Sequence, residues 1–347
     1  MAPKIFLTGV TGFIGGAAFA KIYEKHPDYE YKLFVRSEER AKDVSQKYPD
    51  VKFVYGDLNS TDVIEKAAAE ADIVIHTAES ADSVSAAEAI AKGLAAGHTA
   101  DKPGYWIHLS GTGILTWYDF DNKRFGEGPL PEQKYNDIND IDRLLTLPES
   151  AIHRDVDKIV QAANSDAVKT LIIAPPTIYG TGGGPVNKRS IQVPNLAHAS
   201  LQLGYAPVIG AGKTEWDNVN INDLADLFSR FVDATQDPSK RSNPEIFGRR
   251  AYYFARGGQH VWADIAAWIA EEARRQGYAP DLKTKSVPLE VVSKLGLVSA
   301  ESWGANSKGE AERAKKYLGW EPKGVPLKET IAEAVALEAK KLGLTAR

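Results

Sequence analysis

The stretch Thr8-Gly9-Val10-Thr11-Gly12-Phe13-Ile14-Gly15-Gly16 decides the fold of this chain. It follows the apolar run Ile5–Leu7 and leads into residues 16–23, whose apolar side chains have helical spacing. A strand, a glycine-rich turn and a helix in this order bring backbone N–H groups and a helix N-terminus to a dinucleotide pyrophosphate. The stretch therefore predicts a dinucleotide site near the start of the chain.

Each of the three spaced glycines has a predicted role in that site. Gly9 permits the tight turn, Gly12 lets the phosphates approach the backbone, and Gly15 lets the helix pack close to the strand. The residues between them would also line the cofactor: Thr11, Phe13 and Ile14.

The first half of the chain alternates between short apolar runs and helical stretches such as 62–71 and 83–96. Short, nearly all-apolar strands separated by helices indicate a parallel sheet that is covered on both faces. The predicted strands are Ile5–Leu7, Leu33–Val35, Val51–Tyr55, Ile73–Ile75, Trp106–Leu109 and Leu171–Ala174. We therefore expect an α/β fold, a doubly wound Rossmann sheet with a smaller, helix-rich C-terminal lobe.

The pattern places the dinucleotide-binding core at residues 1–178 and the substrate lobe mainly at 179–347, with some later segments returning to the core. A long polar insertion, 111–149, interrupts the core, and loops of this length are usually functional lids or disordered. The predicted helices of the second half lie near 196–203, 262–276, 308–318 and 327–342.

Composition excludes several classes of function. The 347-residue chain has a net charge of −4, which gives no electrostatic reason to expect nucleic-acid or membrane binding. It has no cysteine, which excludes disulfides, thiolate catalysis and cysteine-ligated metals. The seven histidines show no metal-ligand spacing, so no metal is expected. Without a membrane-length apolar run or a signal-peptide pattern, we expect a cytoplasmic protein.

The end of the second predicted strand selects the cofactor. NAD sites typically place an acidic residue there, whereas this strand ends in Arg36-Ser37. A guanidinium can pair with a 2′-phosphate, which predicts NADP(H) in preference to NAD(H). A solvated charged turn is the alternative interpretation.

Two further strand ends carry candidate cofactor contacts. Asp57-Leu58 follows the third strand, where Asp57 could accept a hydrogen bond from the adenine amine or simply begin the next helix. His76-Thr77 closes the fourth strand near the expected cofactor ribose, although a lone histidine there is more often a packed, hydrogen-bonded residue.

These motifs, in this order, resemble the extended short-chain dehydrogenases/reductases, the family of nucleotide-sugar epimerases and dehydratases. The resemblance covers nearly the whole chain and is specific for the family but not for a substrate. Its motifs are Thr8–Gly15, Gly56–Leu58, His76–Ala78, His108–Thr112, Pro175–Gly180, Trp216–Ala225 and Ala314–Pro322. It implies cofactor contacts from Pro175 and Thr177, a substrate contact from Tyr179, and a possible homodimer.

The chain departs from the family at its catalytic motif. The resemblance implies a Ser or Thr after the fifth strand, which Ser110 and Thr112 supply, and Tyr-x-x-x-Lys on the next helix. Lys158 is the best lysine on that helix and would hold the nicotinamide ribose. Four residues before it stands Arg154, which would polarise the substrate oxygen but cannot serve as a general acid near neutral pH.

The missing tyrosine leaves the proton source open. His153 titrates in a suitable range but lies roughly 140° around the helix from Lys158. The other candidates are three tyrosines: Tyr118 and Tyr135 of the insertion, and Tyr179. The alternative is that Arg154 and Asp157 are ordinary helix-surface charges.

The predicted function is therefore an NADP(H)-dependent oxidoreductase with an atypical site. It would act on a small organic carbonyl, alcohol or conjugated alkene, and the pocket residues carry no signature that names the substrate. Lys188-Arg189 could bind an anion, although a solvated loop pair is the simpler interpretation. Two alternatives stay open, a non-redox isomerase or lyase on the same fold and an NADP-sensing regulatory protein without turnover.

Overall fold

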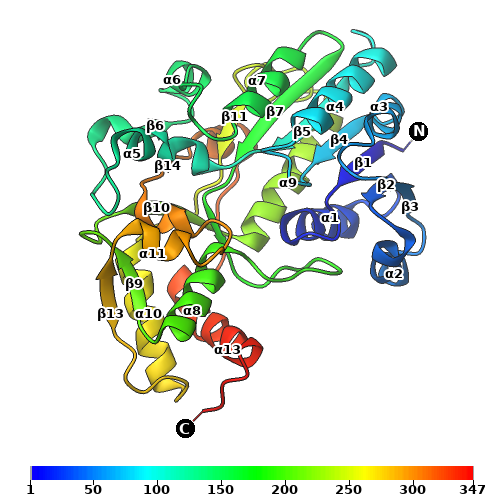
Figure 1. The fold of residues 1–347 in the computed structure, drawn as a ribbon. Helices are drawn as coiled ribbons and strands as arrows, with labels where there is room; N and C mark the ends of the chain where they lie inside the picture. The colour runs from blue at the N-terminus through cyan, green and yellow to red at the C-terminus, as the bar shows by residue number, and fades with distance from the viewer. Residues whose placement is uncertain (1, 347) are drawn as a thin grey trace.

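A seven-stranded parallel sheet forms the centre of the computed structural model, which describes residues 2–346. The strand order is β3-β2-β1-β4-β5-β7-β11 (Figure 1). All strands are parallel, but successive strands are added to one side of β1 up to β3 and to its other side from β4 onward. The strands are β1 Lys4–Thr8, β2 Glu30–Val35, β3 Lys52–Tyr55, β4 Ile73–His76, β5 Gly104–Leu109, β7 Val168–Ala174 and β11 Tyr252–Phe254. In a sheet of this type, ligands bind beyond the carboxyl ends of the strands, where the order reverses. The predicted Rossmann fold is confirmed.

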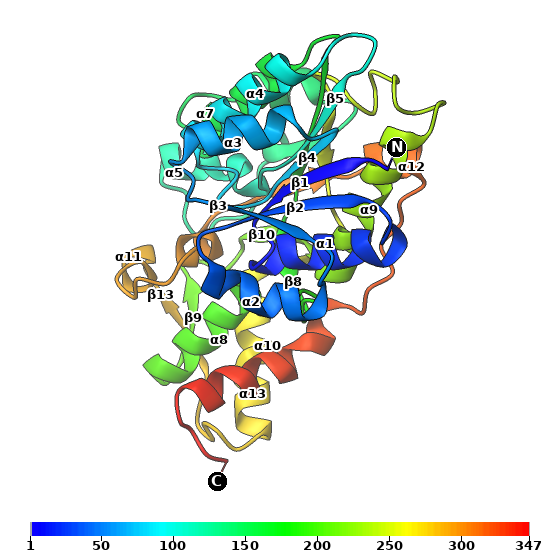
Figure 2. The ribbon, with the colours of Figure 1, turned by 90° about the vertical axis from the view of Figure 1, so that its right-hand side faces the viewer.

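Helices cover both faces of this sheet (Figure 2). The alternating side chains of each strand form two separate cores. Phe6, Val74 and Trp106 pack under one set of helices, whereas Ile5, Ile75 and Ile107 point to the other face. The first face carries α3 Thr61–Ala69, α4 Val84–Gly97 and α7 Arg154–Ala163, and the second carries α1 Phe13–Lys25, α2 Glu38–Lys47 and α9 Ile221–Gln236.

The C-terminal lobe is built from three long helices and small sheets, with a core of its own that includes Trp216, Trp262 and Trp303. Its helices are α8 Gln192–Leu203, α10 Trp262–Arg275, α13 Ile331–Lys341 and the short α11 Leu289–Ser293. Its strands are β8 Thr177–Tyr179, β9 Ala206–Ile209, β10 Glu215–Asn220, β12 Gly258–Val261 and β13 Thr284–Val287. Two later segments, α9 and β11, lie with the sheet rather than with this lobe (Figure 1).

The insertion 111–149 is ordered and contains regular elements. They are the 3₁₀ turns Thr112–Thr116 and Pro131–Gln133, α5 Trp117–Asn122, β6 Lys134–Asn136 and α6 Ile141–Leu145. Strand β6 pairs in parallel with β14 Lys308–Glu310, which ties the insertion to the end of the chain.

That pairing also corrects the helix predicted over 308–318. Only its second part is helical, as α12 Arg313–Leu318. The side chain of Lys308 is buried and donates to Asp217, 3.0 Å away, and Gly309 packs against Phe254. Tertiary contacts therefore hold residues 308–310 as a strand, although the spacing of apolar residues in this segment predicts a helix.

A candidate dinucleotide and active site

The glycine turn between β1 and α1 is shaped to accept a backbone-bound group. Gly9 has a φ of +88°, a left-handed conformation that favours glycine. A β-carbon on Gly15 would lie 2.4 Å from the carbonyl oxygen of Gly9, so only glycine allows this approach. The helix begins at Phe13 after Gly12, with no side-chain cap and no acidic residue in its first turn. Its first N–H groups are thus left for an anion, as a dinucleotide site requires.

The ends of β1 and β4 are locked together beside this turn. Thr8 Oγ1 contacts His76 Nδ1 at 2.8 Å, and Thr77 Oγ1 donates to the carbonyl oxygen of Thr8 at 2.6 Å. His76 is fully buried, and burial lowers its pKa to about 3. His76 and Thr77 therefore hold the ends of the two strands together beside the turn, and their predicted contact with the cofactor stays a prediction.

Arg36 at the end of β2 and Asp57 at the end of β3, the two predicted cofactor contacts, differ in whether other residues already bind their side chains. Arg36 is exposed and forms no ion pair with any residue in 2–346. Asp57 is exposed as well, but its Oδ1 accepts the backbone N–H of Asn59 at 2.9 Å. Leu58 is partly buried and packs against the core under α3 and α4. Arg36 is thus available to a ligand, while Asp57 also stabilises its own turn.

Segment 175–188 joins the sheet edge to the glycine turn. Thr177 is fully buried with an Oγ1 that has no hydrogen-bond partner among the described residues, and the carbonyl oxygen of Pro175 accepts the N–H of Thr112 at 3.0 Å. The N–H of Asn187 donates to the carbonyl oxygen of Thr11 at 3.3 Å. Tyr179, by contrast, is buried in the lobe, where its hydroxyl donates to the carbonyl oxygen of Val325 at 2.8 Å.

Helix α7, which carries the departure from the family motif, turns Arg154 and Lys158 away from β5. Arg154 is buried and donates to the carbonyl oxygens of Leu145 at 2.6 Å and Leu147 at 3.2 Å. Lys158 is part-exposed and pairs with the exposed Glu149. These contacts tie the helix to the end of the insertion and do not place either residue beside Ser110. They give both residues a structural role, and the catalytic role predicted for them stays a prediction.

The residues one position earlier, His153 and Asp157, face the carboxyl end of β5. His153 precedes the helix in a left-handed conformation, φ +69°, and its Nδ1 lies 2.7 Å from Asp82 Oδ1. Its Nε2 lies beside the loop after β5, 3.5 Å from where a β-carbon on Gly111 would stand. His153 is one of the proton sources that the sequence suggests, whereas no local signal in the sequence points to Asp82 as its partner.

Asp157 is fully buried under the same strand end. Its Oδ2 accepts the hydroxyl of Tyr252 at 3.0 Å, while its Oδ1 has no partner among residues 2–346. Burial raises the pKa of Asp157 to about 6, and the nearby hydroxyls of Ser110 and Tyr252 oppose that shift. Ser110 Oγ and Thr112 Oγ1 are themselves buried without partners of good geometry in that part of the chain. This edge of the sheet therefore carries a carboxyl group and two hydroxyls that the protein does not fully satisfy.

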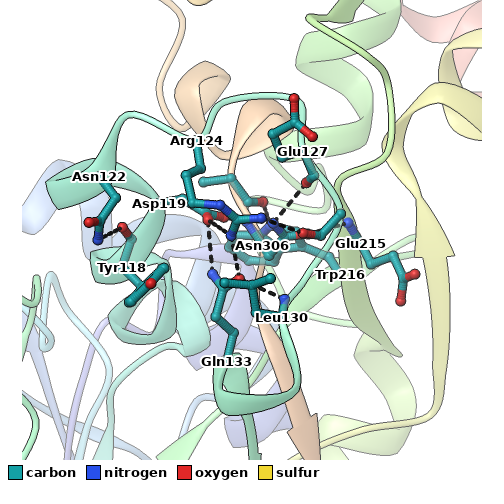
Figure 3. A network of polar contacts seen from close by, with 12 residues as sticks. Tyr118, Asp119, Asn122, Arg124, Glu127, Leu130, Gln133, Glu215, Trp216 and Asn306 are labelled. Atoms are coloured by element: carbon teal, nitrogen blue, oxygen red, sulfur yellow. Dashed lines mark hydrogen bonds and ion pairs between the residues drawn. The ribbon is translucent and has the colours of Figure 1, made fainter.

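The insertion is held against the lobe by a buried polar network around Asp119, seen from close by in Figure 3. Asp119 accepts hydrogen bonds from Arg124 at 3.1 Å, Gln133 at 2.9 Å, and both the backbone N and Nδ2 of Asn306 at 2.7 Å. Next to Asn306, Ser307 donates to the carbonyl oxygen of Thr112 at 2.6 Å. The network thus fixes the loop after β5 between the sheet and the lobe.

The three tyrosines considered as proton sources have contacts within the insertion or the lobe. Tyr135 is buried under Arg143, and its hydroxyl accepts the Trp117 indole N–H at 3.4 Å. Tyr118 lies against Arg124, 5.9 Å from its ring centre. With Tyr179 buried in the lobe, none of the three has a contact that places it at the Ser110 edge.

Comparison with known proteins identifies the family and the type of fold. Residues 9–127 match a family model described as NAD(P)H-binding. An Acremonium protein named oxidase ucsJ is 35% identical over 356 residues, covering 99% of this chain and 100% of that protein. An uncharacterised Saccharomyces cerevisiae protein is 25% identical, covering 94% of this chain and 97% of its own.

Solved structures agree in fold at low sequence identity. A Bacillus anthracis dTDP-glucose 4,6-dehydratase in complex with NAD has a TM-score of 0.64 at 16% identity and covers 98% of this chain and 97% of that one. A Thermotoga maritima UDP-glucose 4-epimerase with UDP-glucose has a TM-score of 0.62 at 16% identity, with coverage of 98% and 99%.

Residues 2–346 lack two other kinds of feature, a membrane-spanning helix and a metal-holding cluster. No helix there has the length and apolar content needed to cross a membrane. No cluster of three histidine, aspartate or glutamate side chains is arranged there to hold a metal ion.

Proposed function

Because this chain belongs to the extended short-chain dehydrogenase/reductase family, which binds NAD(P)(H), we propose that it is an NADP(H)-dependent oxidoreductase of an atypical type. Its substrate would be a small organic carbonyl compound, the matching alcohol, or a conjugated alkene. The observation that carries this proposal is the juxtaposition at one sheet edge of the glycine turn and the unpartnered hydroxyls of Ser110 and Thr112.

The residues of this chain fit the cofactor. The turn at Gly9, Gly12 and Gly15 would hold the pyrophosphate at the N-terminus of α1, and Arg36 would pair with the 2′-phosphate. When bound, NADP(H) supplies or accepts the hydride. Ser110 and Thr112 would orient the substrate oxygen by hydrogen bonds.

Redox turnover is favoured over the isomerase and sensor alternatives by two findings. The relative that is 35% identical over the full length is named an oxidase. A buried carboxyl group, Asp157, and the buried hydroxyls of Ser110 and Thr112 lie at this edge, a polar group that a protein binding only the dinucleotide at its glycine turn has no physical need to keep.

Calorimetric titration with NADPH and NADH tests the cofactor assignment. We expect wild-type protein to prefer NADPH, and Arg36→Ala to reduce that preference about 10-fold or more, because it removes a charge-assisted pair with the phosphate. Arg40→Ala, a second exposed arginine on α2, is the matched control.

Turnover is then followed by the loss of NADPH absorbance with a panel of aldehydes, ketones and enones. Reduction of one of these classes supports the oxidoreductase. Tight NADPH binding without any turnover would favour a sensor, and no binding of either nucleotide would overturn the proposal.

A further inference from the structure

The pair His153–Asp82 has features that packing does not explain. His153 is the N-cap of α7 in the left-handed region, which a residue with a β-carbon adopts at a cost of about 1 kcal/mol. It forms no side-chain hydrogen bond to the helix that it begins. The strained backbone instead holds the ring between Asp82 and the loop after β5.

Asp82 fixes which ring nitrogen remains free. Its carboxylate oxygen Oδ1 lies within hydrogen-bond distance of His153 Nδ1, at 2.7 Å. This hydrogen bond holds the pKa of Asp82 below its usual range. The His153 side chain is 16% exposed, while Asp82 is 70% exposed. Nε2 therefore keeps its proton or lone pair available at the sheet edge.

The neighbouring loop leaves room at that nitrogen. Gly111 and Gly113 flank it, and β-carbons at these positions would lie 3.5 and 3.3 Å from Nε2. The backbone of Gly111 is extended, φ −163°, so any residue could adopt its conformation. A side chain at Gly111 would therefore touch the ring at an ordinary contact distance, and the glycine leaves that space above Nε2 open.

We propose that His153, oriented by Asp82, is the group that exchanges a proton with the substrate oxygen in place of the family's tyrosine. This inference rests on the proposed function. In carbonyl reduction the carbon receives the hydride from NADPH, the C=O π pair moves to oxygen, and the oxygen takes the proton of His153 Nε2 to give the alcohol. The neutral ring then regains a proton from solvent, and alcohol oxidation runs through the same steps in reverse. Asp82 is a positioning residue, because it acts through His153.

The charged and titratable groups around the ring are few. Asp82 contacts it from the segment before α4, Asp157 and Arg154 lie on its own helix, and His108 lies on β5. His108 is fully buried, and burial lowers its pKa well below the usual value, so it is neutral at working pH. The Asp82 carboxylate is therefore the hydrogen-bonded partner that stabilises the protonated ring of His153.

Kinetics of His153→Ala and Asp82→Asn test the assignment, with wild-type NADPH reduction of the best carbonyl as reference. We expect His153→Ala to lower kcat about 100-fold or more, with NADPH affinity by calorimetry unchanged, and added imidazole to restore part of the rate. Asp82→Asn should lower kcat less and move the alkaline limb of the pH profile to lower pH, because the ring loses the carboxylate that stabilises its charged form.

The pair His26–Asp233 offers a matched control. Its His Nε2 and Asp Oδ1 are 2.8 Å apart on α1 and α9, and its histidine is 18% exposed, close to the value for His153. His26→Ala and Asp233→Asn should leave kcat and the pH profile unchanged.

A second readout does not need turnover. In NMR titration of the cofactor-free protein with labelled histidine, the resonance lost in His153→Gln should titrate at lower pH in Asp82→Asn than in wild type. Retained kcat in His153→Ala, or an unshifted His153 titration in Asp82→Asn, would overturn this inference while leaving the proposed function intact. Wild-type protein that reduces no carbonyl would overturn both, since the proton step then has no reaction to serve.

Discussion

Helix α7 turns two pairs of polar side chains, one residue apart in sequence, toward different parts of the molecule. Arg154 and Lys158 lie on the side of the insertion, where backbone carbonyls and an exposed glutamate satisfy them. His153 and Asp157 lie on the side of β5, where the ring is held in a left-handed conformation and a carboxylate oxygen is left without a partner. One side is satisfied and stabilising, whereas the other stores strain and unpaired polar atoms, as reactive sites do.

The comparison teaches that spacing alone does not choose the working side of a helix. Arg154 and Lys158 lie four residues apart within the helix and share one face, whereas His153 precedes the helix and reaches the side of Asp157 through its left-handed backbone. The resemblance to Tyr-x-x-x-Lys selects the pair that ends in lysine, but the contacts favour the pair that precedes it by one residue, a rotation of about 100°.

The largest expected effect is a loss of stability on the side of α7 that faces the insertion. Arg154→Ala leaves the carbonyl oxygens of Leu145 and Leu147 without their donors, so we expect a loss of about 3 kcal/mol in the free energy of unfolding. Urea denaturation measures it, with the exposed Arg275→Ala as control. A loss of turnover without a loss of stability would instead restore Arg154 to the predicted catalytic role.

On the side of α7 that faces β5, a substitution is expected to raise the stability of the protein. Burial raises the pKa of Asp157 to about 6. Between about pH 4 and pH 6 the folded protein therefore keeps a proton on this carboxyl group that the unfolded chain has released. This contribution to stability is full below the unfolded pKa, near 4, and is lost as the pH rises through about 6. Asp157→Asn, which removes the buried charge, should raise stability by about 2 kcal/mol at pH 7.5.

The same variant should differ little from wild type near pH 3, below both pKa values, where the carboxyl group is mostly neutral in both states. Urea midpoints at pH 3 and 7.5 measure the difference. An equal gain at both pH values would mean that the charge is not its origin.

A smaller effect probes the space above His153. Gly111→Ala fits the extended backbone and places its methyl group 3.5 Å from Nε2, an ordinary contact distance. We expect turnover to fall about 10-fold at unchanged stability, because the methyl displaces the substrate oxygen from the ring. Unaltered kinetics would show that Nε2 does not face the substrate.

The smallest effect is expected at the residue that resembles the family's lysine. Lys158 pairs only with the exposed Glu149, so Lys158→Ala should change neither the urea midpoint nor NADPH affinity nor kcat measurably. A drop in both affinity and kcat would restore the predicted contact between Lys158 and the nicotinamide ribose, and would place the working face of α7 one residue later.

Some features of the site are local and can be predicted from sequence. The glycine turn can be predicted from its own spacing, because Gly9 and Gly15 approach each other more closely than any other residue type would allow. The strands also follow from local pattern, since their nearly continuous apolar runs are buried on both faces.

Other features depend on contacts between distant segments. Asp82 and His153 are 71 residues apart, and Asp157 meets Tyr252 across 95 residues. Asp119 and Asn306 are 187 residues apart, yet their hydrogen bonds order an insertion that its polar composition alone describes as a loop. No local periodicity encodes these pairs.

The sequence by itself determined the Rossmann sheet, the glycine turn and the family, because backbone sterics and apolar patterning act over a few residues. Only the tertiary structure decided which side of α7 meets β5. That choice depends on the N-terminal turn of the helix, where a left-handed His153 and the anchoring of Arg154 to Leu145 and Leu147 set the rotation of the helix against the sheet.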